Sequence, residues 1–192
     1  YYSSAATYWD PPEADRQQMR HMIREVGAWL RREVDYRGAF TIDGIMSAQG
    51  FRPTELNPRF GAALRVVANS VRELPLMLLH LAMIEHPELD WRPALLEELL
   101  LTSADSSRAG GAIAIPDKRT EETSYLDLRW SEDHFEVLDA IPTSGKDPLE
   151  ADARCMLGPS PSGSFMSIRF NPETTPVGES LAPRVVAAIE AA

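Results

Sequence analysis

The chain has 192 residues, of which 44% are hydrophobic and 25% are charged, a composition typical of a globular protein with a substantial core. Its formal net charge of −10 argues against binding to nucleic acid or to an anionic membrane, because both are negatively charged. The single cysteine excludes an intrachain disulfide and predicts a reducing, cytoplasmic location, and no apolar run is long enough to predict a membrane span.

The first half of the chain predicts helices arranged around one pair of strands. Asp10 as a cap, followed by Pro11 at the first helical position, predicts a helix that apolar residues at helical spacing extend to residue 34. After the strand pair, helices are predicted over residues 61–72 and 75–85, and a shorter one begins at Asp90 and contains Leu95 to Leu100. The helix over 75–85 is apolar nearly all round, which predicts that it is buried.

Residues 39–59 predict two antiparallel strands joined by a tight turn, with polar side chains on one face. Side chains alternate across a strand, so Asp43 and Ile45 share a face of the first strand, and Glu55 and Asn57 share a face of the second. A three-residue loop over 48–50, with Gly50 in the left-handed conformation, pairs position 47 with position 51. That register predicts that Asp43 lies directly across from Glu55.

Two carboxylates opposite each other on a strand pair repel, so this register predicts a compensating positive charge. The simplest candidate is a hard divalent cation, because Mg²⁺ and Mn²⁺ prefer carboxylate and amide oxygens, and Mg²⁺ usually shares phosphate oxygens with a substrate. Asn57 adds a neutral oxygen beside Asp43 and Glu55, and Arg59 continues in the same direction and could hold an anion. The alternative is an ordinary strand end, at which Asn57-Pro58 opens a turn.

These residues also resemble a known motif. Thr41-Ile-Asp-Gly-Ile45 followed by Glu55-Leu-Asn-Pro-Arg59 resembles the metal-binding hairpin of the ATP-grasp ligases, over residues 1–80 of the chain. The continuation Asn57-Pro-Arg-Phe-Gly-Ala-Ala-Leu64 is similar to the carbamoyl-phosphate synthetase and amino-acid ligase branches. The Gln-Val-Glu-His tail that biotin carboxylases carry after the same arginine is absent, which puts that activity in doubt.

The resemblance implies a role for each residue of the hairpin. Asp43, Glu55 and Asn57 would hold magnesium (or manganese) ions that bridge ATP phosphates. Ile45 would lie beneath the adenine, and Arg59 would steady an anionic substrate or acyl-phosphate. The activity implied is that of an ATP- and Mg²⁺-dependent ligase, which phosphorylates a small-molecule carboxylate and lets an amine or thiol attack the acyl-phosphate.

The family places its glycine-rich loop and ATP-contacting lysines upstream of this hairpin. The chain begins at Tyr1 rather than at a methionine, and its only lysines are Lys118 and Lys146. The expected partner is therefore a missing N-terminal part of the same protein, without which this portion is expected to be inactive. Two other hypotheses stay open: a non-catalytic binding or assembly module of the same fold, and a metal-dependent phosphohydrolase that uses the same acids.

The second half of the chain changes character after a polar break over residues 102–111. Short strand-like runs at 112–115, 124–130, 134–141, 151–157 and 164–170 predict an antiparallel sheet, and a last helix is predicted over 183–191. Cys155 falls in one of these strands without a nearby histidine, which argues against a nucleophile. The predicted fold is therefore α+β, an antiparallel sheet with flanking helices. It consists of an ATP-grasp C-terminal-like subdomain over residues 1–105 and a small β-rich subdomain over 106–192.

Overall fold

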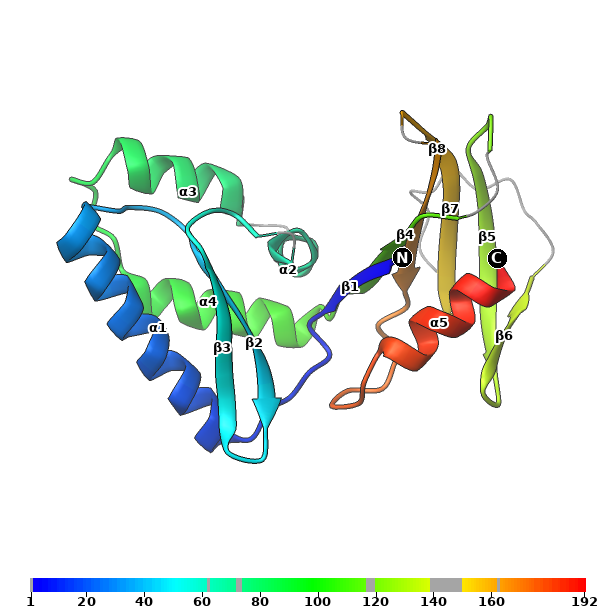
Figure 1. Cartoon of the computed structure of the whole chain (residues 1–192), viewed down its shortest axis with the longest axis horizontal. Coiled ribbons are helices and arrows are strands. Elements are labelled where there is room, and N and C mark those ends of the chain that lie inside the picture. The colour runs from blue at the N-terminus through cyan, green and yellow to red at the C-terminus, as the bar shows by residue number, and fades with distance from the viewer. Residues whose placement is uncertain (1, 62, 72–73, 117–119, 139–149, 162) are drawn as a thin grey trace. The chain divides into compact units, whose positions relative to one another are not determined.

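In the computed structural model, residues 2–61, 63–71, 74–116, 120–138, 150–161 and 163–192 are described. The chain is α+β, as predicted, and every strand pair among these residues is antiparallel. Asp10–Thr102 forms one compact unit, which we call the hairpin unit (Figure 1). Tyr1–Trp9 and Ser103–Ala192 together form the other, which we call the sheet unit.

The division into units corrects one part of the predicted domain organisation. The predicted boundary between residues 105 and 106 lies close to the observed one between Thr102 and Ser103. The assignment of residues 1–9 to the first domain is wrong, because strand β1 (Tyr2–Ala6) pairs with β4 (Gly110–Ala114) and thereby joins the sheet unit. The two strands are separated by more than a hundred residues, and nothing near either of them in the sequence specifies the other.

The hairpin unit consists of helices arranged around a two-stranded sheet (Figure 1). Its elements in chain order are α1 (Glu13–Val34), β2 (Thr41–Ser47), β3 (Gly50–Asn57), α2 (Leu64–Ser70), α3 (Leu76–Glu85) and α4 (Pro93–Ser106). The last of these helices continues past the boundary into the sheet unit. It is longer than the helix predicted from Asp90, because the polar residues after Leu101 continue the helix to Ser106 rather than ending it.

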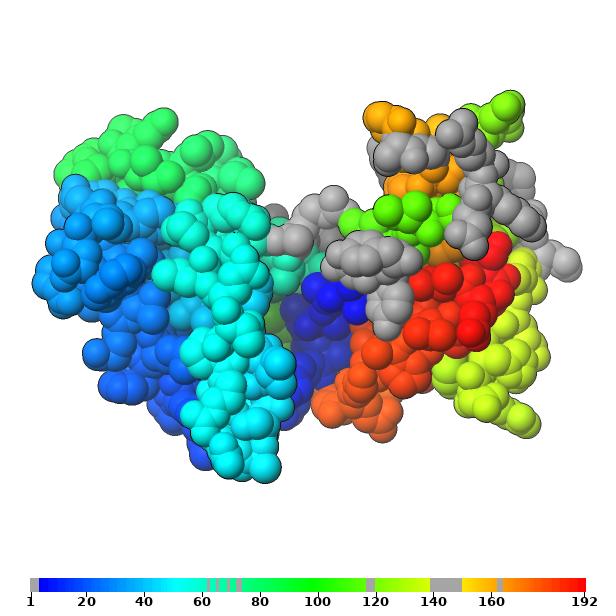
Figure 2. Space-filling model, viewed as in Figure 1, coloured from blue at the N-terminus to red at the C-terminus, as the bar shows by residue number. Residues whose placement is uncertain are grey.

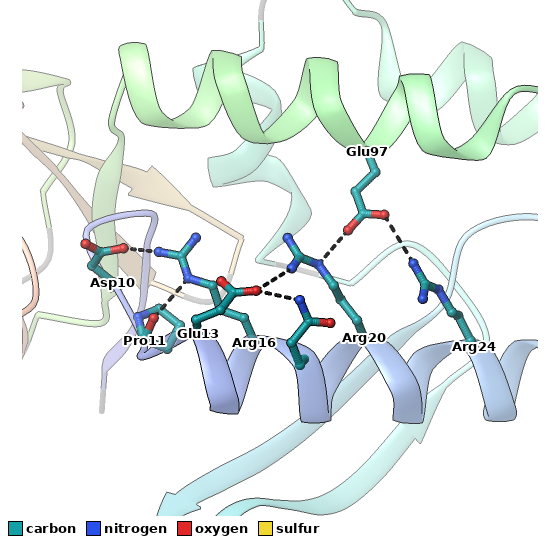
Figure 3. Close-up of polar contacts among 8 residues, drawn as sticks. Asp10, Pro11, Glu13, Arg16, Arg20, Arg24 and Glu97 are labelled. Atoms are coloured by element: carbon teal, nitrogen blue, oxygen red, sulfur yellow. Dashed lines mark hydrogen bonds and ion pairs between the residues drawn. The ribbon is translucent and has the colours of Figure 1, made fainter.

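Helix α1 begins later than predicted. Pro12, not Asp10, occupies the position before the first helical residue, and no side chain caps the helix there. The two consecutive prolines displace the helix start beyond the reach of the Asp10 carboxylate, because the residue before a proline is pushed away from helical geometry. Asp10 instead pairs with the guanidinium of Arg16, one turn into the helix (Figure 3).

A carboxylate of α4 joins that helix to α1. Glu97 Oε1 lies 2.8 Å from Arg20 Nε, and Glu97 Oε2 lies 3.9 Å from Arg24 Nη2 (Figure 3). Arg20 also approaches Glu13 Oε1, at 3.3 Å. Exposed ion pairs of this kind contribute little stability each, about 0.2–1 kcal/mol. They show that Glu97 lies on the side of α4 that faces α1.

The prediction that α3 is buried is wrong. No residue of this helix is fully buried, and Met77, Leu78, Leu81 and Ile84 keep 52%, 62%, 45% and 46% of their surface exposed. An all-round apolar composition identifies a helix that needs cover on every side, but it does not specify which part of the protein supplies the cover. None of the helices formed by the described residues is long and apolar enough to cross a membrane.

The sheet unit is a six-stranded antiparallel sheet in the order β1-β4-β8-β7-β5-β6, with helix α5 lying across it (Figure 1). Its remaining elements are β5 (Ser124–Ser131), β6 (His134–Val137), β7 (Ala153–Ser160), β8 (Gly163–Phe170) and α5 (Ala182–Ala191). Each predicted strand is found within a few residues of its expected place, although residues 139–141 of the predicted 134–141 strand lie outside the described part of the chain. Val185 and Ala188 of α5 complete a core to which β4, β5, β6, β7 and β8 all contribute buried residues.

The thiol of Cys155 is part of that core and has no exposed surface. Burial, with a smaller contribution from the charge of Asp127, raises the pKa of Cys155 to about 12 from an ordinary value of 9.0. The thiol is therefore protonated at neutral pH and unsuited to act as a nucleophile, in agreement with the sequence.

We expect the sheet unit to lose stability as pH rises above about 9 toward 12. A buried thiol whose pKa is raised on folding keeps its proton in the folded state, whereas the unfolded chain releases it, so alkaline pH favours unfolding by about 1.4 kcal/mol per pH unit in this window. Urea unfolding at pH 8, 9 and 10 measures the effect, and Cys155→Ala should remove it. Tyr8, whose pKa burial also raises, is retained in both proteins, so their difference isolates the thiol. Equal pH dependence in the two would contradict the assignment.

Candidate metal and anion site

The β2–β3 hairpin places Asp43 directly across from Glu55, as predicted. The predicted turn is wrong. Ser47 pairs with Gly50, so the connection is a two-residue turn, Ala48-Gln49, rather than a three-residue loop. The Ser47 hydroxyl donates to the Gly50 carbonyl over 2.9 Å and accepts from the Gln49 N–H over 3.1 Å, which stabilises the shorter turn. Gly50 does have the expected positive φ, of 91°.

A β-bulge restores the pairing that the shorter turn would otherwise have shifted by one residue. Gly44 pairs with Pro53, Asp43 pairs with Glu55, and Thr54 is the extra residue between them. Pro53 has no N–H to give to a strand pair and is therefore suited to an irregularity of this kind. The Thr54 hydroxyl donates to the Asp43 carbonyl over 3.2 Å. Pro53 is the sequence signal from which the bulge could have been predicted.

One face of the hairpin packs against α1. A β-carbon at Gly27 of α1 would lie 3.6 Å from the ring of Phe40, and the Gln18 side chain accepts from the Phe51 N–H over 2.9 Å. The Phe51 ring lies so close to Gly44 that a β-carbon there would be 2.3 Å away. The side chains that alternate with these apolar groups therefore point away from α1.

The opposite face is open and carries the predicted site. Asp43 and Glu55 are exposed, and Ile45, two residues along the strand from Asp43, keeps 64% of its surface accessible. Figure 2 shows part of the hairpin surface uncovered. The register adds Arg52, which pairs with Ile45 and so lies on the same face as Asp43. Without a bulge, alternation along the second strand would place Arg52 on the face opposite Glu55. The extra residue at Thr54 brings Arg52 and Glu55 onto the same face.

Hydrogen bonds connect three of the predicted residues. The Asn57 side chain donates from Nδ2 to Asp43 Oδ2 over 3.1 Å, and Arg59 Nη2 donates to Asn57 Oδ1 over 3.4 Å. The Arg59 N–H also donates to the Asn57 carbonyl over 2.8 Å, which turns the chain back at the end of β3. Glu55 makes no hydrogen bond or ion pair with any other residue that the structure describes. Its carboxylate is therefore available to a ligand.

The donor set matches a hard divalent cation in its chemistry. It contains two carboxylates on neighbouring strands and one amide, and among the described residues no group of three or more His, Cys, Asp and Glu side chains could hold a metal. The amide is thus needed to complete the set. At present Asn57 turns its nitrogen toward Asp43, so a half-turn of that amide is required to present its oxygen beside the two carboxylates.

No family model, curated protein or solved structure matches this chain. Paired carboxylates with a neighbouring amide are oxygen ligands of the kind that divalent cations prefer, and Arg59 adds a cationic group that donates to Asn57. Arg52 lies on the same face, where its Nη2 donates to Gln49 Oε1 in the turn over 3.0 Å. Such a surface suits a ligand that carries both phosphate oxygens and a coordinated metal.

Proposed function

We propose that the hairpin unit is the metal- and nucleotide-binding C-terminal part of an ATP- and Mg²⁺-dependent ligase of the ATP-grasp type, acting in the cytoplasm. The observation that carries the proposal is the pairing of Asp43 with Glu55 on the open face of the hairpin. A like-charged pair across a strand ladder is unfavourable without a cation, and this pair has been kept in register by a bulge.

Each residue of the open face has a role in the proposed reaction. Asp43, Glu55 and Asn57 would hold Mg²⁺ or Mn²⁺, which when bound supplies neutralisation of charge on the ATP phosphates. Arg59, anchored through the Asn57 amide, would orient an anionic substrate or acyl-phosphate. Ile45 offers an exposed apolar surface for the adenine. Phosphoryl transfer depends mostly on such positioning and charge compensation, and asks little covalent chemistry of the protein.

The proposal includes a partner, an upstream part of the same protein. By the resemblance, the lysines that contact ATP come from sequence upstream of this hairpin, whereas Lys118 and Lys146 both follow it. The half-exposed apolar side chains of α3 support the proposal that this unit packs against a further segment. The same two observations favour the second candidate, a non-catalytic binding or assembly module of the same fold.

Turnover by the longest natural form of the protein separates these candidates. With Mg-ATP, a panel of small carboxylates and an amine or thiol acceptor, a ligase is expected to release ADP and phosphate only when both substrates are present. A binding module would bind Mg-ATP without turnover, and a phosphohydrolase would release phosphate without an acceptor. Mn²⁺ binding by the present chain, measured by electron paramagnetic resonance, tests the hairpin directly. Absence of Mn²⁺ binding both by the present chain and by the longest natural form of the protein would refute the proposed site.

A further inference from the structure

His80 of α3 contacts both chain segments at the open end of the hairpin, the one before β2 and the one after β3. Its Nδ1 accepts a 2.8 Å hydrogen bond from the N–H of Ala39, two residues before β2 begins. Its ring also lies edge-on to the ring of Phe60, three residues after β3 ends, with centroids 5.6 Å apart and planes inclined at 62°. One side chain therefore connects the segment that enters the hairpin with the segment that leaves it.

The segment that enters the hairpin depends on side chains for its hydrogen bonds. Ala39 lies outside regular secondary structure. Its N–H donates to His80, and its carbonyl accepts from the Tyr36 hydroxyl over 2.7 Å. Gly38 permits the close approach of the imidazole, because its φ is +113° and a β-carbon there would lie 2.7–2.8 Å from the ring. The bond to Ala39 thus requires an unprotonated ring nitrogen, not merely a side chain that fills space.

The segment that leaves the hairpin lies next to the candidate site. Phe60 directly follows Arg59 in the chain. A β-carbon at Gly61 would lie 2.8 Å from the Thr41 hydroxyl, and Thr41 pairs with Asn57. The end of the hairpin that His80 holds is therefore the end at which Asn57 and Arg59 are placed.

We propose that His80 is a positioning residue for the Asp43–Glu55–Asn57 site. By accepting from the Ala39 N–H, beside the Phe60 ring, it holds the open end of the hairpin so that the ligands on the two strands stay in register. The inference rests on the proposed function for the metal, but the contact of His80 with the hairpin can be tested without it. His80 touches no metal ligand itself, so it acts only through the backbone.

Two substitutions at this position separate the acceptor from the ring. His80→Asn keeps an acceptor close to the place of Nδ1, because the asparagine Oδ1 is the same number of bonds from the backbone. His80→Phe keeps an aromatic ring against Phe60 and loses the acceptor. His86, just beyond the end of the same helix, is exposed, and among the described residues its ring bonds to Glu88, from Nδ1 over 3.0 Å, so His86→Phe is the matched control.

The readouts are hydrogen exchange of the Ala39 amide without metal and the Kd for Mn²⁺. In His80→Phe we expect exchange to be at least about tenfold faster and the Kd about tenfold weaker, whereas His80→Asn and His86→Phe stay within about twofold of the wild type. A role limited to packing would give the reverse order. His80→Phe would then keep the wild-type exchange rate and Kd, and His80→Asn would show faster exchange and a weaker Kd, which would overturn the inference.

Failure of the proposed function and failure of this inference give different results. If the wild-type chain binds no Mn²⁺, the proposed function fails, while faster Ala39 exchange in His80→Phe still supports the hold of His80 on the hairpin. If the wild type binds Mn²⁺ and His80→Phe binds it equally well, the positioning role is overturned and the metal site stands. Unchanged Ala39 exchange in His80→Phe overturns the inference in either case.

Discussion

Alanine in place of Asp43 or Glu55 is expected to lower ATP-dependent turnover by the longest natural form of the protein more than about 100-fold, to the limit of detection. The open face of the hairpin presents these two carboxylates and one neutral amide, so either substitution removes half of the formal charge that a divalent cation meets there. Acceptor-dependent ADP release measures the loss. Mn²⁺ binding by the present chain should disappear in the same two variants.

When no metal is present, the two carboxylates should lower the stability of the protein, because they repel each other. Glu55 faces Asp43 across the ladder and makes no hydrogen bond or ion pair elsewhere in the described structure. Glu55→Gln is therefore expected to raise the metal-free unfolding free energy slightly, by about 0.2–0.5 kcal/mol, because both groups are exposed and screened. The wild type alone should gain about 1.4 kcal/mol from Mg²⁺ at ten times its Kd.

A second strand glutamate provides the matched control. Glu136 of β6 is also exposed, but it lies across from Arg129 of β5, an opposite charge. Glu136→Gln should therefore lower stability slightly and leave the response to Mg²⁺ unchanged. Full turnover in both Asp43→Ala and Glu55→Ala would refute the metal assignment. The Glu-Leu-Asn-Pro-Arg segment would then be explained as an ordinary strand end.

The hairpin shows how far local pattern alone could predict this site. Alternation and a turn signal at Gly50 predicted the pairing of Asp43 with Glu55 that the structure shows. The prediction nevertheless contained two errors that cancelled, a turn one residue too long and a missing bulge at Thr54. Pro53 could have indicated the bulge, because a proline cannot complete a strand ladder. The uncorrected strand placed Arg52 on the wrong face, so a cationic member of the open face was missed.

Contacts between distant parts of the chain were beyond the reach of sequence pattern. The strand Tyr2–Ala6 carries no signal that its partner is Gly110–Ala114, because both are short, small-residue strands whose pairing is chosen by the whole sheet. The hydrogen bond from Ala39 to His80 was missed for the same reason, because α2 separates the hairpin from α3 in the sequence. The apolar composition of α3 indicated that its side chains favour burial, but it could not identify the part of the protein that packs against them.

Asp127→Ala is expected to be the most destabilising single substitution considered for the sheet unit, at about 3–5 kcal/mol. Asp127 of β5 lies across from Arg154 of β7 and accepts two hydrogen bonds from its guanidinium, from Nε over 2.5 Å and from Nη2 over 2.8 Å. The Arg154 side chain keeps only 6% of its surface exposed and Asp127 only 20%. Removing the carboxylate takes one close negative charge away from a buried guanidinium that lies directly across from Arg169 on the next strand.

An exposed pair with similar N···O distances provides the control for this cost. Arg92 donates to Asp90 over 2.9 and 2.8 Å, but the two side chains are 71% and 76% exposed, so Asp90→Ala should cost less than about 1 kcal/mol. Urea unfolding followed by hydrogen exchange of sheet-unit peptides measures both. The double variant Asp127→Leu/Arg154→Met should recover much of the loss, because apolar replacement of a buried pair removes the desolvation cost of both charges. The two ion pairs differ in burial. If Asp127→Ala lowers the unfolding free energy no more than Asp90→Ala does, burial does not determine how much each pair contributes to stability.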